Sequence, residues 1–286
     1  MQRPRPDPGT VAETATLEAG ARPEVRRPDT TMPVAITGHD AAPAVTVAIR
    51  TRNEIRTIAT VLRLLKSQTY PIHELLVIDN LSTDGTREIA AREADRVIDV
   101  AAFTHAGSTN LAIDEARGEL VYLTNGHCFP EHAEMLEAGA RTLAADARIA
   151  GVYGRCRPHR DALLANTFER AIAFAGNLTW PRTFQVERRF RPGMMQTQSA
   201  MVRRSLARSV PFEDIGAGGG EDALFAMEVL HRGHLVAYHP ALDVQHSHGG
   251  WNSVAAQRFL AYGRMIARAR EIAASRGIPA SIRGRR

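Results

Sequence analysis

The stretch ELLVIDNLSTDGTREIAARE, residues 74–93, joins a short apolar run to a segment that starts like a helix. Its first part, ELLVIDN (74–80), is typical of a buried strand that ends in polar residues. Its second part, STDGTREIAARE (82–93), opens with Ser, Thr and Asp, which favour a helix N-terminus. The stretch therefore predicts a strand, a polar turn and a helix in direct succession.

The same alternation of strand and helix patterns runs through the first half of the chain. Pro130, in the first turn, favours a helix start at the beginning of 130–145. Gly118 is expected to close the helix predicted over 106–118. Alternation at this spacing indicates βαβ units and a mostly parallel sheet flanked by helices, the α/β class. The predicted strands are 45–50, 74–80, 96–100, 119–125 and 147–154, and the predicted helices are 56–68, 82–93, 106–118 and 130–145.

The second half of the chain is less regular. Its patterns predict one further α/β half without a linker, so that a single domain covers 43–250, followed by a basic C-terminal helix and tail over 251–286. The predicted elements are a strand running into a short helix (193–209), a flexible glycine turn (216–220), two short strands (within 234–248) and helices at 161–175, 221–233 and 252–275.

Positive charge is concentrated at the C-terminal end of the chain. The net charge is +5, and residues 251–286 contain eight Arg and one acid (+7), so the other 250 residues carry −2. A basic amphipathic helix of this kind contacts anionic lipid, packs on the protein body or mediates a homodimer, and the sequence leaves these three open. No aromatic-studded basic stripe accompanies it, so we expect no nucleic-acid partner.

The N-terminal residues 1–42 show no hydrophobic periodicity and predict a disordered leader. No apolar run approaches the roughly 18 residues of a membrane span, and the N-terminus lacks the apolar core of a signal peptide. We therefore expect a cytoplasmic protein, with peripheral contact at the inner membrane face as the alternative. Cys128 and Cys156 are too few for a structural zinc site and are interpreted as packing residues.

Polar residues follow the predicted strands at the edge where ligands bind in parallel α/β sheets. The carboxylate of Asp79 can accept hydrogen bonds from a nucleobase or a ribose hydroxyl. An ordinary strand–helix junction with side-chain caps explains the same residues equally well. The candidates at this edge are Thr51, Arg52, Asn53, Glu54, Asp79, Asn80, Asn125 and His127.

The glycine turn GAGGG (216–220) leads into an acidic pair, Glu221 and Asp222. A dinucleotide-binding loop would need glycine where Glu221 stands, so we reject that interpretation. Asp222 is a candidate general base whose pKa Glu221 would raise, or the pair merely complements the helix dipole. Farther on, His246 and His248 are two residues apart on an extended segment and point the same way. They line one pocket or form a surface pair.

Several segments together resemble the family-2 glycosyltransferases with the GT-A fold, and among them the rhamnosyltransferase-type branch. The resemblance covers roughly 44–250. Its motifs are VTVAIRTRNE (45–54), SQTYPIHELLVIDNLSTDGTREIA (67–90), FTHAGSTNLAIDEARGELVYLTN (103–125), QTQSAMVRRS (196–205), GGEDALFAMEVLHRG (219–233) and LVAYHPALDVQHSH (235–248).

The resemblance implies a GT-A fold with a Rossmann-like nucleotide-binding half and an acceptor-binding half. It implies transfer of a hexosyl or deoxyhexosyl group from a UDP-, dTDP- or GDP-linked sugar to an acceptor hydroxyl, with inversion. Asp222 would be the base and Glu221 its neighbour. The residues implied to bind the nucleotide are Thr51, Asn53, Glu54, Asp79, Asn110 and Asn125.

The chain departs from this family at the D-x-D motif, which binds a divalent cation, Mn²⁺ or Mg²⁺. Asn125, Gly126 and His127 stand in its place. Three interpretations follow: His127 binds the metal with His246 or His248, His127 contacts the diphosphate directly, or the site is inactive. The last would make the chain a non-catalytic sugar-nucleotide-binding or scaffold protein. Nearby arginines, Arg155 among them, hold the diphosphate or form a solvated surface.

Overall fold

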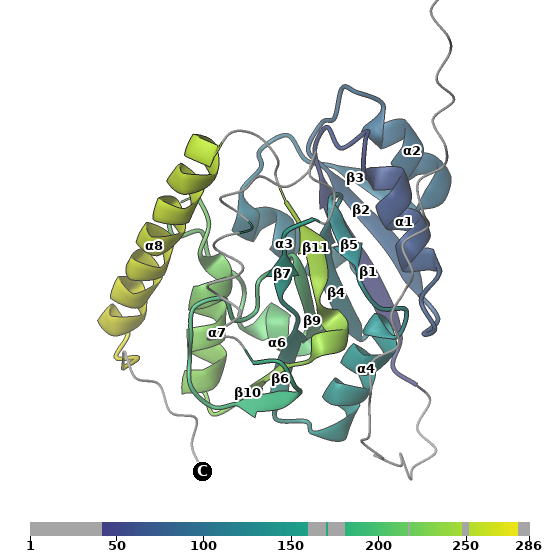
Figure 1. Ribbon diagram of the computed structural model, residues 1–286. Coiled ribbons are helices and arrows are strands. Elements are labelled where there is room, and N and C mark those ends of the chain that lie inside the picture. The colour runs from purple at the N-terminus through teal and green to yellow at the C-terminus, as the bar shows by residue number, and fades with distance from the viewer. Residues whose placement is uncertain (1–41, 160–169, 171–180, 217, 248–251, 280–286) are drawn as a thin grey trace, which may run out of the picture.

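The computed structural model describes residues 42–159, 170, 181–216, 218–247 and 252–279. The predicted leader lies outside these residues apart from Ala42, as does the helix predicted over 161–175 apart from Arg170. A mixed sheet of eight strands forms the centre, with helices on both faces (Figure 1). Its order is β3-β2-β1-β4-β9-β6-β10-β8.

Most of the strands lie where the apolar runs predict them. The strands of the large sheet are β1 (Val45–Thr51), β2 (Glu74–Asp79), β3 (Arg96–Asp99), β4 (Leu120–Asn125), β6 (Ile149–Tyr153), β8 (Gln185–Glu187), β9 (Ser199–Arg203) and β10 (Leu235–Tyr238). Parallel pairing joins β3, β2, β1 and β4 and also joins β6 to β10, whereas β9 runs antiparallel between β4 and β6. The carboxyl ends of β1, β2 and β4 therefore share one edge.

Each face of the sheet has its own apolar core. The helices of the described chain are α1 (Ile58–Lys66), α2 (Thr86–Glu93), α3 (His105–Glu115), α4 (Met135–Ala145), α6 (Arg204–Ser209), α7 (Glu221–His231) and α8 (Asn252–Ser275), with the 3₁₀ turn η1 (Pro240–Leu242). Buried residues of α1, α2 and α4 pack on one face, and those of α3, α6, α7 and α8 pack on the other. None of these helices is both long and apolar enough to cross a membrane.

A small three-stranded sheet stands beside the large one. It has the order β5 (Cys128–Pro130), β11 (Val244–His246) and β7 (Cys156–Arg157). The helix start predicted at residue 130 is wrong for this reason. Pro130 ends β5 opposite Val244, and the next amide, that of Glu131, donates to the carbonyl of Asp243, so the chain stays extended and α4 begins only at Met135.

The expectation for Gly118 is also wrong, since α3 ends at Glu115. Gly118 instead lies against β1, where a Cβ atom would come within 2.6 Å of the amide nitrogen of Thr46. Its own amide donates to the Thr46 hydroxyl at 2.8 Å. Gly118 is therefore required by the close approach of two chain segments and not by the end of a helix.

The C-terminal helix α8 packs along α7 (Figure 1). Ile266, Ala269 and Ala273 are buried in the same core as α7, and Met265 covers Gly219 and Gly220 of the glycine turn. Of the alternatives that the sequence left open for this helix, packing on the body is the one that the structure displays.

Candidate active site

The ends of β1 and β2 are connected to each other by hydrogen bonds between their loops. The Asp79 carboxylate accepts from the hydroxyl and the amide of Ser82, at 2.6 and 2.8 Å. The Asn53 side-chain oxygen accepts from the amide of Thr83, and the Asn53 amide donates to Ser82 Oγ, both at 2.9 Å. Asn53 and Leu81 adopt left-handed conformations, with φ of 53° and 48°. The two loops form one rigid rim at the sheet edge.

His127 lies at the end of β4 in a chain of polar contacts. Its Nδ1 atom is 2.7 Å from Glu54 Oε1, and its Nε2 atom is 3.0 Å from Nε2 of His246. The two imidazole rings stack with their centroids 4.8 Å apart. A carboxylate that holds one ring nitrogen of a histidine fixes the tautomer and the ring orientation, and here Nε2 points at His246. The sequence predicts that Glu54 binds the nucleotide. In the structure its carboxylate orients His127.

Gly126 allows this arrangement because it has no side chain. A Cβ atom there would lie 2.7 Å from Thr51 Oγ1 and 3.3 Å from Cγ of Glu54. The Gly126 carbonyl accepts a hydrogen bond from Thr57 at 2.8 Å. Thr51 Oγ1 is buried, and no described residue satisfies it. The Thr51 hydroxyl therefore lies close under the turn at Gly126.

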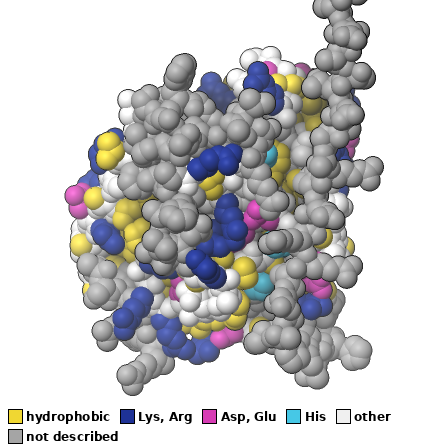
Figure 2. All heavy atoms as spheres, in the orientation of Figure 1, with side chains coloured by type: hydrophobic (Ala, Val, Ile, Leu, Met, Phe, Trp, Pro, Cys, Tyr) yellow, Lys and Arg dark blue, Asp and Glu magenta, His cyan; other side chains and the backbone are white. Residues whose placement is uncertain are grey.

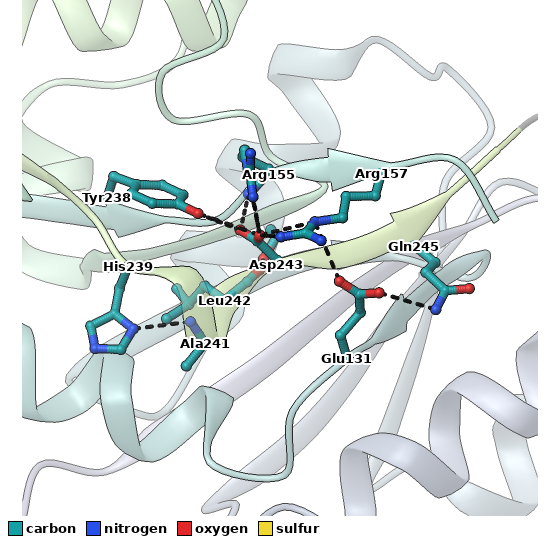
Figure 3. Close-up of polar contacts among 10 residues, drawn as sticks. Glu131, Arg155, Arg157, Tyr238, His239, Ala241, Leu242, Asp243 and Gln245 are labelled. Carbon is teal, nitrogen blue, oxygen red and sulfur yellow. Dashed lines mark hydrogen bonds and ion pairs between the residues drawn. The ribbon is translucent and has the colours of Figure 1, made fainter. Parts of the chain in front are cut away.

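His246 is brought to His127 by the small sheet. Its strand β11 pairs antiparallel with β5, and His246 stands opposite Cys128, next to His127. Fully buried Asp243 anchors β11: it accepts from Arg155, Arg157 and Tyr238 (Figure 3).

Glu131 lies at the edge of this ion cluster. It forms an ion pair with Arg157 at 3.5 Å and accepts a hydrogen bond from Gln245 at 3.1 Å (Figure 3). Arg155 is 7 % exposed, so the solvated-surface interpretation is wrong for it. The role of the cluster is to hold the strand that carries His246.

The acidic pair lies at the first turn of α7. Glu221 is buried and Asp222 is partly buried, with its Oδ1 atom 2.7 Å from the amide of Ala223. Burial, and after it the charge of Glu221, raises the pKa of Asp222 to about 8. Asp222 in turn adds to the raised pKa of Cys156 in β7, whose largest cause is burial. The charge of Asp222 thus acts on β7, a strand of the small sheet that carries His246.

A buried guanidinium, that of Arg50 in β1, is held by neutral groups. Arg50 donates to the hydroxyls of Thr109 and Thr197 at 2.8 and 2.7 Å and to the carbonyl of His105 at 3.2 Å. Burial lowers the pKa of Arg50, and the charges of Glu221 and Asp222 oppose that shift. Figure 2 shows cationic, acidic and histidine side chains close together near the middle of the face that it draws.

The structure gives Asn110 another role than the one predicted. Its carboxamide nitrogen donates to the carbonyl of Phe212 at 2.7 Å, and its oxygen accepts from the Phe212 amide at 2.9 Å. Both ends of the side chain are thereby engaged, so Asn110 ties α3 to the segment before α7. Asn125 ends β4 opposite Arg50 and is partly buried, at the predicted edge. His248 lies outside the described residues.

The donors at this edge suit a transition metal in part. Two imidazole nitrogens 3.0 Å apart are ligands that Mn²⁺ accepts, and Glu54 holds one of them in place. Within the described ranges no group of three or more His, Cys, Asp or Glu side chains is arranged to hold a metal ion.

The sequence predicts Asp222, His127 and His246, of which the structure brings the two histidines together, but it does not predict two further contacts. Glu54 contacts His127 across 73 residues, and Arg50 reaches Thr197 across 147. One signal was available: arginine in the otherwise apolar run VTVAIR (45–50) requires a special environment.

Comparison with known proteins gives consistent matches. A profile described as "Glycosyl transferase family 2" matches residues 46–210. The chain is 28 % identical over 193 residues to the O-antigen chain rhamnosyltransferase WbaN of Salmonella anatum, covering 64 % of this chain and 59 % of the relative. It is 28 % identical over 217 residues to the O-antigen chain rhamnosyltransferase RfbN of Salmonella typhimurium, covering 71 % and 66 %. The chain thus spans about three fifths to two thirds of the length of these relatives.

Solved structures show the same architecture. A mannosyltransferase from Pyrobaculum calidifontis, in complex with GDP-Man and Mn²⁺, superposes with a TM-score of 0.56 at 21 % identity. The match covers 82 % of this chain and 75 % of that one. It confirms the predicted GT-A fold.

Proposed function

Because the chain belongs to glycosyl transferase family 2, we propose that it transfers a sugar from a nucleotide-diphosphate donor to a hydroxyl of an acceptor, with inversion at the anomeric carbon. The observation that carries this proposal is the place of Asp222. It is a partly buried carboxylic acid with a raised pKa, in the first turn of α7 beside Glu221. An acid of this kind, poised near neutral pH, suits general base catalysis.

Asp222 would accept the proton of the acceptor hydroxyl while the hydroxyl oxygen attacks the anomeric carbon. The bond between that carbon and the diphosphate oxygen breaks, and the diphosphate leaves with the electron pair. Burial, and after it the charge of the neighbouring Glu221, keeps the pKa of Asp222 high enough for this role. The pKa of about 8 places the proton transfer close to the working pH of most enzymes.

The nucleoside would lie on the rim formed by the first two strand ends. Fully buried Asp79 holds that rim in shape, and exposed Asn53 presents the remaining acceptor position of its side-chain oxygen. Asn125 extends it at the end of β4. The rhamnosyltransferase relatives support a deoxyhexose as the transferred sugar and a polysaccharide as the acceptor.

The diphosphate would lie at His127 and His246. These two histidines would hold a divalent cation together with diphosphate oxygens, with Glu54 setting the orientation of His127. The cation, when bound, neutralises the charge that develops on the leaving diphosphate. Peripheral membrane contact and a homodimer remain predictions for the outer face of α8.

The test is the substitution Asp222→Asn, assayed as release of nucleoside diphosphate from dTDP-rhamnose, UDP-glucose and GDP-mannose with a polysaccharide acceptor. Transfer should fall by a factor on the order of 10² to 10⁴, the usual contribution of a general base. Calorimetric binding of the nucleoside diphosphate should stay unchanged. The exposed acid Glu93, replaced by Gln, is the matched control. Full transfer by Asp222→Asn would remove the proposed base.

A further inference from the structure

A cavity of about 550 Å³ lies at the edge of the large sheet opposite to the candidate active site. Leu120, the first residue of β4, lines it together with Arg203, the last residue of β9, and the two residues are paired across these strands. The other end of β4 is Asn125, at the candidate active site. Small-molecule sites usually measure roughly 300–1,000 Å³. The cavity is therefore large enough to hold a small molecule.

The lining of this cavity is basic. Among the described residues that line it, four are arginines and one, Glu119, is an acid, which gives a net charge of +3. The arginines come from the segment before β4, from the end of β9 and from α6. A concave surface with this excess of guanidinium groups attracts anions. The four are Arg117, Arg203, Arg204 and Arg208.

Two of these arginines are held in place by backbone carbonyls. Arg203 donates to the carbonyls of Ile149 and Asp146, at 3.0 and 3.1 Å. Arg204 donates to the carbonyl of Asp114 at 2.8 Å. These bonds satisfy carbonyls at the ends of α4 and α3, but they leave both guanidinium charges without a carboxylate partner and both Nη1 atoms without an acceptor among the described residues. Capping of the two helices therefore uses only part of each guanidinium.

The other two arginines lie at the rim of the cavity. Arg117 is 3.6 Å from Glu74 and Arg208 is 3.0 Å from Asp114, and neither acid lines the cavity. The side chains of Arg117 and Arg208 are 64 % and 54 % exposed. Exposed ion pairs of this kind contribute little to stability, so these side chains can turn toward a bound anion at small cost.

We propose that this cavity is a second ligand site, which binds a small molecule through a phosphate group. Guanidinium groups bind phosphate oxygens through pairs of parallel hydrogen bonds. Arg203 and Arg204 supply donors that are already fixed, and Arg117 and Arg208 close on the anion from the rim. A phosphate monoester carries a charge of about −1.5 to −2 near neutral pH, which matches this lining better than the single charge of a carboxylate.

The remaining lining suits the uncharged part of such a molecule. Pro43, Leu120 and Ala144 contribute apolar surface to the same cavity. Glu119 would repel a second anionic group, so a ligand with one phosphate fits better than a polyphosphate. The site lies at the opposite edge of the sheet from His127, and the inference therefore does not depend on the proposed function.

The experiment is a calorimetric titration of the full chain with inorganic phosphate at fixed ionic strength. EDTA is present to remove the divalent cations through which phosphate would bind at His127. The double variant Arg204→Gln/Arg208→Gln should bind phosphate at least about 10-fold more weakly, the effect of losing a hydrogen bond to a charged group. Arg264→Gln makes the same kind of charge change on exposed α8 and should bind like the unaltered chain. Equal affinity in the double variant, or an equal loss in Arg264→Gln, would overturn the proposal.

A second variant covers the case in which Arg204→Gln does not fold. Arg117→Gln/Arg208→Gln changes only the two exposed arginines and should also weaken phosphate binding. Vesicles of phosphatidylcholine with phosphatidic acid, in a sedimentation assay, separate the sources of the phosphate group. Vesicle binding that this variant loses would assign a lipid headgroup, and phosphate binding without vesicle binding would assign a free molecule. Binding of neither probe would overturn the proposal and leave the proposed transfer reaction standing, since neither assay measures transfer.

Discussion

The Nε2 atoms of His127 and His246 lie 3.0 Å apart, although 119 residues separate them along the chain. The family motif at this strand end carries carboxylates, and here an imidazole pair takes that position. Imidazole favours transition metals over Mg²⁺. Nitrogen ligands at this edge therefore predict a preference for Mn²⁺ over Mg²⁺.

Glu54 should control this site through the orientation of His127. Glu54→Gln keeps the size of the side chain but weakens the hydrogen bond that His127 Nδ1 makes with Oε1 at 2.7 Å. Loss of such an outer contact typically weakens metal affinity by about 10- to 100-fold. We expect that loss for Mn²⁺ in calorimetric titrations made with nucleoside diphosphate present.

The control for this prediction is His73→Ala. His73 is exposed and directly precedes β2, at the end of the strand opposite to Asp79. Its Mn²⁺ affinity should match that of the unaltered chain. Unchanged affinity in Glu54→Gln would mean that the carboxylate does not set the position of His127.

Asp222→Asn should stabilise the fold increasingly as the pH rises. The folded-state pKa of Asp222 is raised to about 8, so between about pH 4 and pH 8 the folded chain holds a proton that the unfolded chain has lost. The stability of the unaltered chain therefore falls as the pH increases through this range. Asparagine does not ionise and escapes this loss.

The measurement is the difference in Tm between Asp222→Asn and the unaltered chain from pH 5 to pH 9. The difference should grow up to about pH 8 and then level off. A difference independent of pH would show that Asp222 is not held protonated by its surroundings.

Gly126→Ala should destabilise the turn beneath His127. The new Cβ atom would meet Thr51 Oγ1 at 2.7 Å, and overpacking of this kind costs about 1–3 kcal/mol. Thr51→Ala removes that atom, which is buried without a described partner, so the double variant should recover part of the loss. Denaturant unfolding of the two single variants and the double variant measures this recovery.

Gly263→Ala is the matched control, since no atom lies within 4 Å of the Cβ that it would add in α8. It should be neutral or slightly stabilising in the same denaturant experiment. Strictly additive effects of the Gly126 and Thr51 substitutions would contradict the proposed clash.

Asp243→Asn should lower the free energy of unfolding and disturb the contact between His127 and His246. It leaves Arg155 and Arg157 around a neutral group, and breaking a buried ion cluster in this way typically costs about 3–5 kcal/mol. Because Asp243 anchors β11, the Mn²⁺ affinity of His246 should fall as well. Glu93→Gln, which breaks the exposed pair with Lys66, should change neither quantity. Retained Mn²⁺ affinity in Asp243→Asn would show that the ion cluster is not needed to position His246.

The order of the strands and helices could be predicted from the sequence because apolar runs such as 45–50 and 74–80 are local signals. The helix start predicted at Pro130 failed for a non-local reason. Residues 128–130 pair with a strand more than 110 residues away, and that pairing overrides the local preference. The small sheet as a whole has no signal of its own in a single sequence.

The candidate site likewise contains residues that a local sequence signal predicts and contacts that only the fold determines. His127 could be proposed from its place after a strand, whereas Asp222 became the candidate base through the family resemblance. The contacts of Glu54 with His127 and of Arg50 with Thr197 depend on which chain segments meet in space. The unpartnered hydroxyl of Thr51 likewise follows from the path of the turn above it.

Calorimetric binding of UDP, dTDP and GDP, each with EDTA, Mg²⁺ and Mn²⁺, shows whether this chain binds a sugar nucleotide through a metal ion. We predict that one nucleoside diphosphate binds, that Mn²⁺ strengthens the binding and that His127→Ala abolishes this strengthening. Equal binding in EDTA would contradict the metal site and leave protein cations to hold the diphosphate. No binding of any nucleotide under any condition would contradict the account of a sugar-nucleotide-dependent transferase.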